Sequence, residues 1–416
     1  MLERPLLQLP AGMRDFAPEA AATRRHIAGA LLQVFERWGY ARVITPAFEY
    51  EEVLALGLGP AGRDSTIRFV EPSSGQVVAL RPDITPQIAR LIATRFRDEP
   101  GPLRLCYEGT VVRFDRRSRS QRELIQAGVE LAGVPSPAGD AEMIALGAEA
   151  LAALGLRQPT IDLGHLGLTR EVLDALRLPE EARAAARERI AKRDRAGLRE
   201  VLRAAEGPKA VVDFALALPE LAGPPATVTK ALRRAPTAGI RRALRNLDEL
   251  LQELSRRELP ARLQVDLGEV RGFDYYTGVR VLGYVEGAPD AVLQGGRYDT
   301  LVERYGRRCP AVGCAVDVER AALACESQGI EPGLARAGEG GGVLVVGPPR
   351  QAWQAAAALR AQGRRAVAYF GELEGAALES YARRWQFAEL AHTDGRRTAI
   401  ASKGPAARTR RAPCPS

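Results

Sequence analysis

The stretch Val-Asp-Leu-Gly-Glu-Val-Arg-Gly-Phe-Asp-Tyr-Tyr-Thr-Gly occupies residues 265–278, and Gln-Gly-Gly-Arg-Tyr-Asp follows at residues 294–299. Alternating apolar and polar residues lead into a turn and a second apolar run leads back, which predicts a β-hairpin. The predicted hairpin carries Arg, Asp and paired Tyr side chains. A pocket for a small zwitterion needs such groups, because carboxylates hold an ammonium, Arg holds a carboxylate, and Tyr supplies shape and hydrogen bonds. The stretch therefore indicates a binding site for a small polar molecule.

The composition is that of a globular protein. The chain has 416 residues, of which 46% are hydrophobic and 26% are charged, and a chain of this length suits roughly two to three domains. No apolar run reaches the roughly 18 residues of a membrane span, and the first ten residues lack the apolar core of a signal peptide. We therefore expect a cytoplasmic protein.

The net charge of +8 comes mainly from arginine, since only 4 of the 59 basic residues are lysine. Arginine binds phosphates bidentately, so the charge alone allows nucleic-acid binding. However, arginine is spread over the whole chain together with abundant Ala and Gly. This distribution favours a compositional bias over a dedicated nucleic-acid surface.

The cysteines and histidines form no recognisable catalytic or metal-binding pattern. The cysteines are odd in number and widely spaced, which argues against a disulfide framework; they are Cys106, Cys309, Cys314, Cys325 and Cys414. Cys309 and Cys314 lack the second Cys pair or nearby His that a zinc site needs. The three histidines lie far apart in the sequence. We therefore expect no metal and no cofactor.

Hydrophobic periodicity predicts mixed helices and strands in the first 165 residues. Helices are expected at 18–38, 85–96 and 138–154, and strands at 41–48, 77–80, 103–113, 123–133 and 160–163. Thr85 is expected to cap the helix that follows it, with Pro86 at the first helical position. Five arginines between positions 113 and 122 are expected in a loop that joins two antiparallel strands.

An all-helical insertion is predicted at about residues 165–260, where Ala, Leu, Arg and Glu dominate and strand signals are few. This insertion interrupts a core that spans residues 1–330, and a strand at 312–316 is followed by a helix that starts at 317. A Gly- and Ala-rich segment at 331–342 predicts a linker. Residues 343–400 predict a small α/β module that begins strand, helix, strand, and residues 401–416 predict a disordered basic tail.

Five segments, in order, resemble motifs of class II histidyl-tRNA synthetases. They are Leu-Arg-Pro-Asp-Ile-Thr at 80–85, a motif 2-like segment at 107–133, Arg271 to Tyr276 with Phe273 in place of Leu, Gly-Gly-Arg-Tyr-Asp at 295–299, and a motif 3-like segment at 313–320. The resemblance covers about residues 9–330. It implies an α+β fold with a class II aminoacyl-tRNA synthetase-like antiparallel sheet of roughly six or seven strands and flanking helices.

Two branches share this scaffold: active synthetases, and regulatory subunits of ATP phosphoribosyltransferase that lack aminoacylation. Departures from the synthetase pattern favour the regulatory branch. Asp83 stands in place of a Glu, and the loop after Arg113 reads Phe114-Asp115-Arg116-Arg117 instead of His-Glu-Arg-Pro. Leu124 stands where synthetases place an aromatic residue on adenine, and losing it removes roughly 1–3 kcal/mol of stacking. The insertion sequence and the short C-terminal module also resemble the regulatory branch.

The resemblance therefore implies a non-catalytic regulatory subunit, required for the first step of histidine biosynthesis and involved in feedback regulation by histidine. The implied partners are the short-form catalytic subunit in a hetero-oligomer, a second copy of the chain through motif 1 at about residues 41–50 and the preceding helix, and L-histidine. Neither tRNA nor a membrane is expected. Two alternatives stay open: an active histidyl-tRNA synthetase with a reduced anticodon-binding module, because Arg113, Arg271 and Arg320 are retained, and a free-standing histidine sensor.

The same resemblance implies a set of histidine-binding residues, namely Asp83, Thr85, Arg113, Gln126, Glu130, Arg271, Tyr275, Tyr276 and Tyr298. Asp83 and Glu130 would face the α-ammonium and Arg113 the carboxylate, while Glu130 or a tyrosine would hold the imidazole. Asp83 is one methylene shorter than the Glu of synthetases, so the ammonium site would be looser. The alternative interpretation for Tyr275 and Tyr298 is packing within strands.

Overall fold

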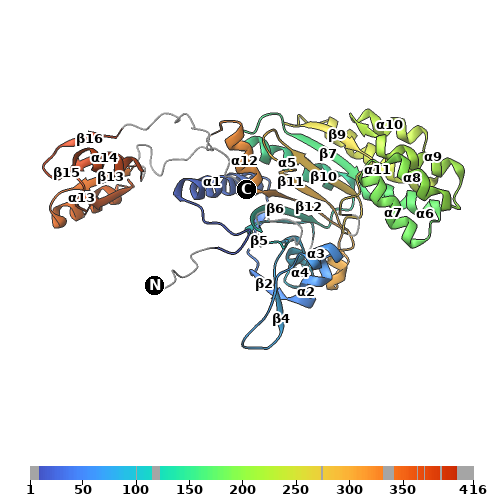
Figure 1. Ribbon diagram of the computed structural model, residues 1–416, viewed down its shortest axis with the longest axis horizontal. Coiled ribbons are helices and arrows are strands. Elements are labelled where there is room, and N and C mark those ends of the chain that lie inside the picture. The colour runs from blue at the N-terminus through green and yellow to red at the C-terminus, as the bar shows by residue number, and fades with distance from the viewer. Residues whose placement is uncertain are drawn as a thin grey trace, which may run out of the picture. The chain divides into compact units, whose positions relative to one another are not determined.

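The computed structural model describes residues 9–99, 101–114, 122–272, 275–330, 342–362, 364–369, 371–384 and 387–400. The chain forms two compact units, Met1–Pro332 and Gly333–Ser416 (Figure 1). The predicted tail lies outside the described residues, as do most of the predicted linker and of the Arg-rich loop. None of the described helices is both long and apolar enough to cross a membrane.

A nine-stranded sheet, counted over the described residues, forms the centre of the larger unit (Figure 1). Six neighbouring strands are antiparallel, in the order β5 (Leu103–Val112), β6 (Glu123–Ala132), β12 (Ala311–Asp317), β11 (Leu293–Arg297), β10 (Val279–Tyr284) and β7 (Thr160–His165). The sheet is wider than predicted because short strands extend both edges. They are β1 (Ala41–Arg42), parallel to β5, and β9 (Arg262–Asp266), parallel to β7 and followed by β8 (Ala222–Gly223).

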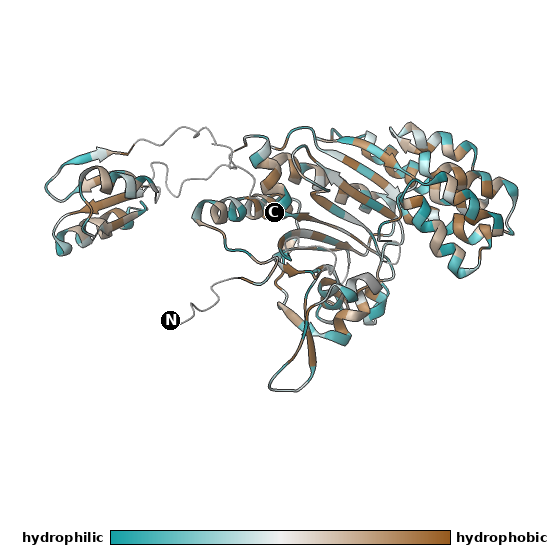
Figure 2. Cartoon of the chain, viewed as in Figure 1, coloured by the Kyte–Doolittle hydropathy of each residue, from teal (hydrophilic) through white to brown (hydrophobic). Residues whose placement is uncertain are grey.

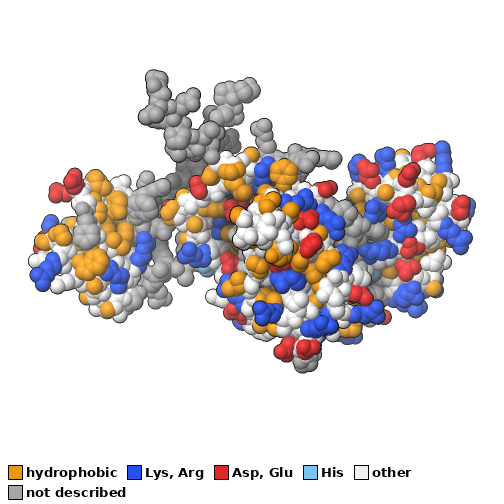
Figure 3. Space-filling view, turned by 90° about the horizontal axis from the view of Figure 1, so that it is seen from below, with side chains coloured by type: hydrophobic (Ala, Val, Ile, Leu, Met, Phe, Trp, Pro, Cys, Tyr) orange, Lys and Arg blue, Asp and Glu red, His pale blue; other side chains and the backbone are white. Residues whose placement is uncertain are grey.

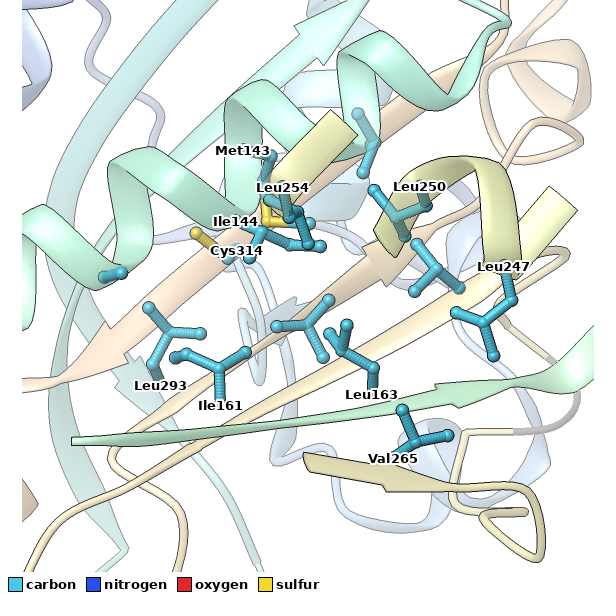
Figure 4. Packing of buried hydrophobic residues seen from close by; sticks show 14 of the residues in the cluster. Met143, Ile144, Ile161, Leu163, Leu247, Leu250, Leu254, Val265, Leu293 and Cys314 are labelled. Atoms are coloured by element: carbon cyan, nitrogen blue, oxygen red, sulfur yellow. The ribbon is translucent and has the colours of Figure 1, made fainter. Parts of the chain in front are cut away.

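Helices α1 (Pro18–Arg37), α5 (Pro137–Ala153), α11 (Ala238–Ser255) and α12 (Val318–Ser327) contribute to the main hydrophobic core of this unit. Their apolar side chains meet those of the strands in a single cluster. Figure 4 shows Met143 and Ile144 of α5 and Leu250 of α11 above Ile161 and Leu163 of β7. Helix α5 is buried almost all round, which fits its apolar composition.

A smaller three-stranded sheet packs beside α4 (Thr85–Thr94) and α2 (Glu51–Gly57), with α3 (Pro60–Asp64) and the 3₁₀ helix η3 (Val302–Tyr305) nearby. Its strands, in the order β2-β4-β3, are β2 (Phe48–Tyr50), β4 (Val77–Leu80) and β3 (Arg68–Val70). The single strand predicted at 41–48 is therefore wrong. The chain leaves the large sheet after Arg42 and enters the small one at Phe48, and Pro46, which has no N–H to donate, lies in the gap.

The segment predicted as an all-helical insertion is mainly helical but also contains the short strand β8. Between β7 and β9 lie α6 (Leu166–Leu176), α7 (Glu180–Ala191), α8 (Arg195–Val201), η1 (Leu202–Ala204), α9 (Lys209–Ala217), η2 (Leu218–Glu220), α10 (Ala226–Arg233) and α11. His165 joins it to the sheet: its Nδ1 accepts from the Leu168 N–H at 3.1 Å and its Nε2 lies 3.2 Å from Asn246 Oδ1. Burial lowers the pKa of His165 to about 4, so the neutral ring can accept at the start of α6.

The smaller unit is an α/β module whose four-stranded sheet has the order β14-β13-β15-β16. Its elements are β13 (Gly342–Val346), α13 (Pro349–Ala361), β14 (Ala366–Tyr369), α14 (Gly375–Arg384), β15 (Phe387–His392) and β16 (Arg397–Ala399). Helices α13 and α14 belong to separate core clusters: Val343 and Val345 of β13 pack with α13, and Leu344 and Val346 pack with α14. Because both faces of β13 are covered, its sequence is a continuous apolar run (Figure 2). The sequence predicted only the first three elements.

Candidate ligand-binding site

A cavity lies in the larger unit between strands β6, β11 and β12, the start of α4, and the loop that precedes β10. Seven of the nine predicted histidine-binding residues line it: Asp83, Thr85, Arg113, Gln126, Tyr275, Tyr276 and Tyr298. The fold therefore brings together residues from widely separated segments of the sequence. The walls combine carboxylate, guanidinium, amide and phenol groups, which is the mixture that a zwitterionic ligand requires.

Glu130 lies directly beneath this cavity on β6 and is only 1% exposed. Its Oε1 accepts hydrogen bonds from Thr85 Oγ1 at 2.7 Å and from Tyr107 OH at 3.3 Å, while its Oε2 accepts from the Tyr298 hydroxyl. Burial, together with the nearby charge of Asp83, raises the pKa of Glu130 well above its ordinary value. No described residue forms an ion pair with Glu130, so a cationic ligand group could contact this carboxyl without displacing a cation of the protein.

Thr85 acts differently from its predicted role as a helix cap. The N-cap of α4 is Ile84, which makes no side-chain hydrogen bond, and the backbone N–H of Thr85 donates to Asp83 Oδ1 at 3.3 Å. Thr85 is the first helical residue, with Pro86 following it, and its hydroxyl donates to Glu130 instead. The prediction of a cap is therefore wrong, because Thr85 lies inside the helix and its hydroxyl donates to the Glu130 carboxyl instead of accepting from a backbone N–H of the first turn.

Gln126 contributes an unused acceptor to the cavity wall. Its Oε1 is buried and has no hydrogen-bond partner among the described residues. Leaving a buried polar atom without a partner costs about 1–3 kcal/mol, so such atoms indicate a missing ligand or water molecule. An ammonium or imidazole N–H in the cavity would satisfy this oxygen.

Tyr275, Tyr276 and Tyr298 form an aromatic cluster at one end of the cavity. The centroid of the Tyr275 ring lies 4.8 Å from that of Tyr276 and 5.5 Å from that of Tyr298. Tyr275 and Tyr276 lie in a turn and not in a strand, because Gly272 has a φ of 74° and its carbonyl accepts from both of their N–H groups. A Cβ at Gly272 would also lie 2.7 Å from the Tyr276 ring.

The predicted hairpin is therefore only partly right. The antiparallel pair is β10 with β11, in which Arg280 faces Gly296 across the strands. Strand β9, which was expected to form the first arm, instead pairs in parallel with β7. The signature segment forms the loop between β9 and β10, and its Phe273 and Asp274 lie outside the described residues.

Two polar residues that the sequence reasoning missed support the tyrosines. Arg280 is 4% exposed, lies over the Tyr276 ring at 4.7 Å, and donates to the Gly295 carbonyl at 2.7 Å. It also donates to Oε1 of Gln294, which lines the cavity. A charged residue inside the apolar sequence of β10 could have identified Arg280 as a candidate site residue, since buried arginines are rare unless they are paired. Alternate residues of a strand point to the same face of the sheet, so Gln294 and Gly296 lie on one face of β11, and Tyr298 follows two residues later.

Arg271 lies outside the inner cavity. It lines an adjoining cleft of about 740 Å³ that also reaches Arg187 and Glu188 of α7. Its Nε donates to Glu269 Oε1 at 3.0 Å and its Nη2 donates to Glu269 Oε2 at 2.5 Å, and its side chain is half-exposed. Arg113 lines both the cavity and the cleft, and its Nε donates to the Pro82 carbonyl at 2.8 Å. Arg113 is thus placed at the entrance to the cavity.

Arg320, the third arginine retained from the synthetase pattern, is held by carboxylates. It lies 3.2 Å from Asp290 and 3.4 Å from Asp317, and it donates to the Ala291 carbonyl at 2.7 Å. Asp317 also caps α12 by accepting from the Glu319 and Arg320 N–H groups. Arg320 would have to leave these partners before it could bind a phosphate.

Comparison with known proteins establishes the family. The family model described as histidyl-tRNA synthetase matches residues 12–321. An ATP phosphoribosyltransferase regulatory subunit of Geobacter sulfurreducens is 44% identical over 74% of this chain and 71% of its own length. Another, from Anaeromyxobacter dehalogenans strain 2CP-1, is 42% identical over 80% of this chain and 96% of its own length. The chain belongs to this family of regulatory subunits.

Solved structures agree with that family assignment. A structure described as an ATP phosphoribosyltransferase regulatory subunit/histidyl-tRNA synthetase from Bacillus halodurans has a TM-score of 0.79 at 26% identity, covering 94% of this chain and 99% of its own. A histidyl-tRNA synthetase from Nostoc sp. PCC 7120 has a TM-score of 0.75 at 19% identity, which shows the shared fold alone. The predicted class II synthetase-like α+β fold is thus confirmed.

Replacing Arg81 with alanine is expected to lower the free energy of unfolding by about 3 kcal/mol. Arg81 is buried, and its guanidinium donates to the carbonyls of Thr110 at 2.7 Å and Thr45 at 3.0 Å. The truncation would leave both carbonyls without this partner. Urea denaturation would measure the loss. The exposed pair of Arg68 with Glu51 offers a control, and an Arg81→Ala loss as small as that of Arg68→Ala would contradict the expectation.

Proposed function

We propose that this chain is a non-catalytic regulatory subunit that binds the catalytic subunit of ATP phosphoribosyltransferase in the cytoplasm and controls its activity in response to histidine. The observation that carries the proposal is the 42% identity to a relative named as such a regulatory subunit, over 96% of that relative's length. The relative's name supports the partnership, and the geometry of the cavity supports the ligand.

Histidine fits the chemistry of the cavity walls. Asp83 and the buried Glu130 would hold the ammonium, and Arg113 at the entrance would hold the carboxylate. The imidazole would lie against the tyrosine cluster, where Gln126 offers an unpaired acceptor. Arg271 is the weakest member of the proposed set, because its guanidinium is committed to Glu269 outside the cavity.

Loss of aminoacylation fits two features near the cavity. Leu124 is partly buried and packs against the cluster that contains Tyr107 and Tyr298, so this position offers an aliphatic contact and no aromatic platform for adenine. Arg320 is engaged by two carboxylates, as described above. Both features weaken the hold on ATP, and they support the regulatory role over the alternative of an active synthetase.

Co-expression with a short-form catalytic subunit tests the proposal. We expect a stable complex whose ATP phosphoribosyltransferase activity exceeds that of the catalytic subunit alone and falls when histidine is added. Absence of a complex would refute the proposal. Histidine-dependent ATP–pyrophosphate exchange by the purified chain would support the synthetase alternative, and calorimetric histidine binding without either activity would support the free-standing sensor.

An exposed apolar surface supports the proposed homodimer. It comprises five residues of the small three-stranded sheet and one that precedes it: Phe48, Tyr50, Phe69, Val70, Val77 and Ile44. Figure 3 looks toward this end of the larger unit, where orange hydrophobic side chains lie among charged ones. Ile44 is 85% and Val70 is 60% exposed, the Phe48 and Phe69 rings pack against each other, and Val70 pairs with Val77. Exposed apolar side chains gathered in this way mark interaction sites. The surface includes the motif 1 segment that was expected to pair.

The double substitution Ile44→Asp with Val70→Asp is therefore expected to convert the dimer into a monomer. Two carboxylates buried without partners in an apolar interface would cost several kcal/mol. Light scattering coupled to size exclusion would measure the mass. The matched control is Val367→Asp, since Val367 is an exposed apolar residue of the smaller unit. A wild-type chain that is already monomeric, or a double variant that stays dimeric, would refute the assignment of this surface.

A further inference from the structure

A strongly basic surface lies on the insertion where α10 ends and α11 begins. Within residues 230–245 there are six basic residues and no acidic residue, against a net charge of +8 for the whole chain. All six are exposed: Lys230, Arg233, Arg234, Arg241, Arg242 and Arg245. We call them the α10–α11 basic surface. Both helices are labelled on the insertion in Figure 1.

Other basic residues of the insertion are neutralised by local partners. Arg183 pairs with Asp174, Lys192 with Glu188 at 2.5 Å, Arg193 with Asp266 at 2.6 Å, Arg195 with Glu220 at 2.9 Å and Arg203 with Glu200 at 2.6 Å. The α10–α11 basic surface differs. Of its six residues, Arg242 forms an ion pair, with Glu171 at 3.5 Å. No ion pair with a described residue is formed by Lys230, Arg233, Arg234 or Arg245.

Folding of the insertion does not require this charge. Lys230 and Arg233 lie in the last turn of α10, where the helix dipole favours cations. Arg241 and Arg242, however, lie near the N-terminus of α11, where the dipole disfavours them and where the first turn has no acidic residue. The buried face of α11 consists of Ile240, Ala243, Leu244 and the leucines that follow, so none of the basic side chains serves the core. Local contacts with described residues involve only two of the six residues, because Arg241 donates to the Ala235 carbonyl at 3.0 Å and Arg242 lies 3.5 Å from Glu171.

The chemistry of the surface fits an acidic protein partner. Residues 226–258 contain no aromatic side chain, so the surface lacks the stacking platforms that single-stranded nucleic acids use. The planar guanidinium group of arginine binds a carboxylate through two parallel hydrogen bonds, and arginine residues are enriched at protein interfaces. We propose that the α10–α11 basic surface docks an acidic face of the catalytic subunit. This inference rests on the proposed function and names the surface through which the two subunits meet.

Charge reversal of Arg233, Arg234 and Arg245 to glutamate tests the inference in the full-length chain. The control reverses three exposed basic residues elsewhere on the insertion, Arg199, Arg203 and Lys209, which gives the same change in net charge. Association of each protein with the catalytic subunit would be measured at low and high salt, and thermal melting would verify that both variants fold. We expect the surface variant to bind at least about tenfold more weakly than the control, mainly through slower association, and to lose most of the salt dependence.

The outcomes separate the inference from the function on which it rests. If the wild-type chain binds the catalytic subunit and the two variants bind equally well, the surface assignment is wrong and the regulatory function stands. If the wild-type chain does not bind at all, both fail. A short RNA duplex serves as a second probe: if the surface variant loses RNA binding but keeps the catalytic subunit, the surface is a nucleic-acid site and the inference is overturned.

Discussion

A Gly313→Ala variant is expected to lose at least about 3 kcal/mol of stability. Gly313 lies on β12 directly opposite Glu130 of β6. A Cβ at this position would lie 1.7 Å from Glu130 Oε2 and 2.5 Å from the Val129 carbonyl oxygen. Neither atom can retreat, because Glu130 is held by three hydroxyl groups and Val129 by the sheet.

Gly29→Ala is the matched control for Gly313→Ala. Gly29 lies within α1, and a Cβ there would meet nothing within 4 Å. Because alanine favours a helix interior over glycine by about 0.8–1 kcal/mol, this variant is expected to be as stable as the wild type or slightly more so. Urea denaturation followed by circular dichroism would compare the two. A Gly313→Ala loss below about 1 kcal/mol would mean that the strands separate more easily than the packing implies.

A Glu130→Gln variant is expected to fold but to bind histidine at least about 100-fold more weakly, a loss of roughly 3 kcal/mol. The amide has nearly the volume of the carboxyl, so the packing around β6 is preserved. It cannot ionise to balance a ligand ammonium, and its NH₂ group would face hydroxyls that now donate to Glu130. Isothermal calorimetry would measure the affinity. Glu108→Gln on β5, which removes an exposed carboxylate paired with Arg42, should leave the affinity unchanged.

Histidine binding to the wild type is also expected to release protons. Burial and the charge of Asp83 raise the pKa of Glu130, so in the unliganded protein this carboxyl keeps its proton to a higher pH than an ordinary glutamate does. Contact with an ammonium favours the ionised form and expels the proton. The measured enthalpy should therefore change with the ionisation enthalpy of the buffer in the wild type and not in Glu130→Gln. Equal slopes for the two proteins would show that Glu130 does not meet the cation.

The same raised pKa fixes the sign of a pH effect on stability. A glutamate in the unfolded chain has a pKa of about 4.5, so above this pH the unfolded state has lost a proton that folded Glu130 retains. The folded state thus binds more protons, and the contribution of Glu130 to stability falls as the pH rises above about 4.5. A bound histidine would oppose that fall, because its ammonium stabilises the ionised carboxylate.

The parts of the fold that the sequence predicted are those with strong local signals. The long paired strands β5 and β6, the helix α5 and the helical insertion all have sustained periodicity or composition. The errors concern pairings that depend on distant partners. Strand β9 joins β7 in parallel, and the two-residue strands β1 and β8 have too little sequence to show a period.

The candidate site was predictable to the extent that ordered motifs marked it. Residues such as Asp83, Gln126 and Tyr298 were selected because of their motifs, and the fold places them around one cavity. Arg280 and Tyr107 were missed, because their roles depend on a Tyr276 ring and a Glu130 carboxyl that approach them only in three dimensions. Arg271 matched a motif but lies in the adjoining cleft, because its guanidinium donates to the carboxylate of Glu269, which lies two residues earlier in the chain.

The position of Arg81 has a consequence for how two copies of the chain would respond to histidine. Its guanidinium donates to the Thr45 carbonyl and its backbone N–H donates to the Ala47 carbonyl, and both acceptors lie in the segment proposed to pair. Two residues after Arg81, Asp83 lines the cavity. A shift of this segment on pairing would therefore move the cavity wall, and a bound ligand would move the segment by the same linkage. If two copies pair at this surface, histidine would change the strength of the pairing, and the pairing would change the affinity for histidine by the same factor.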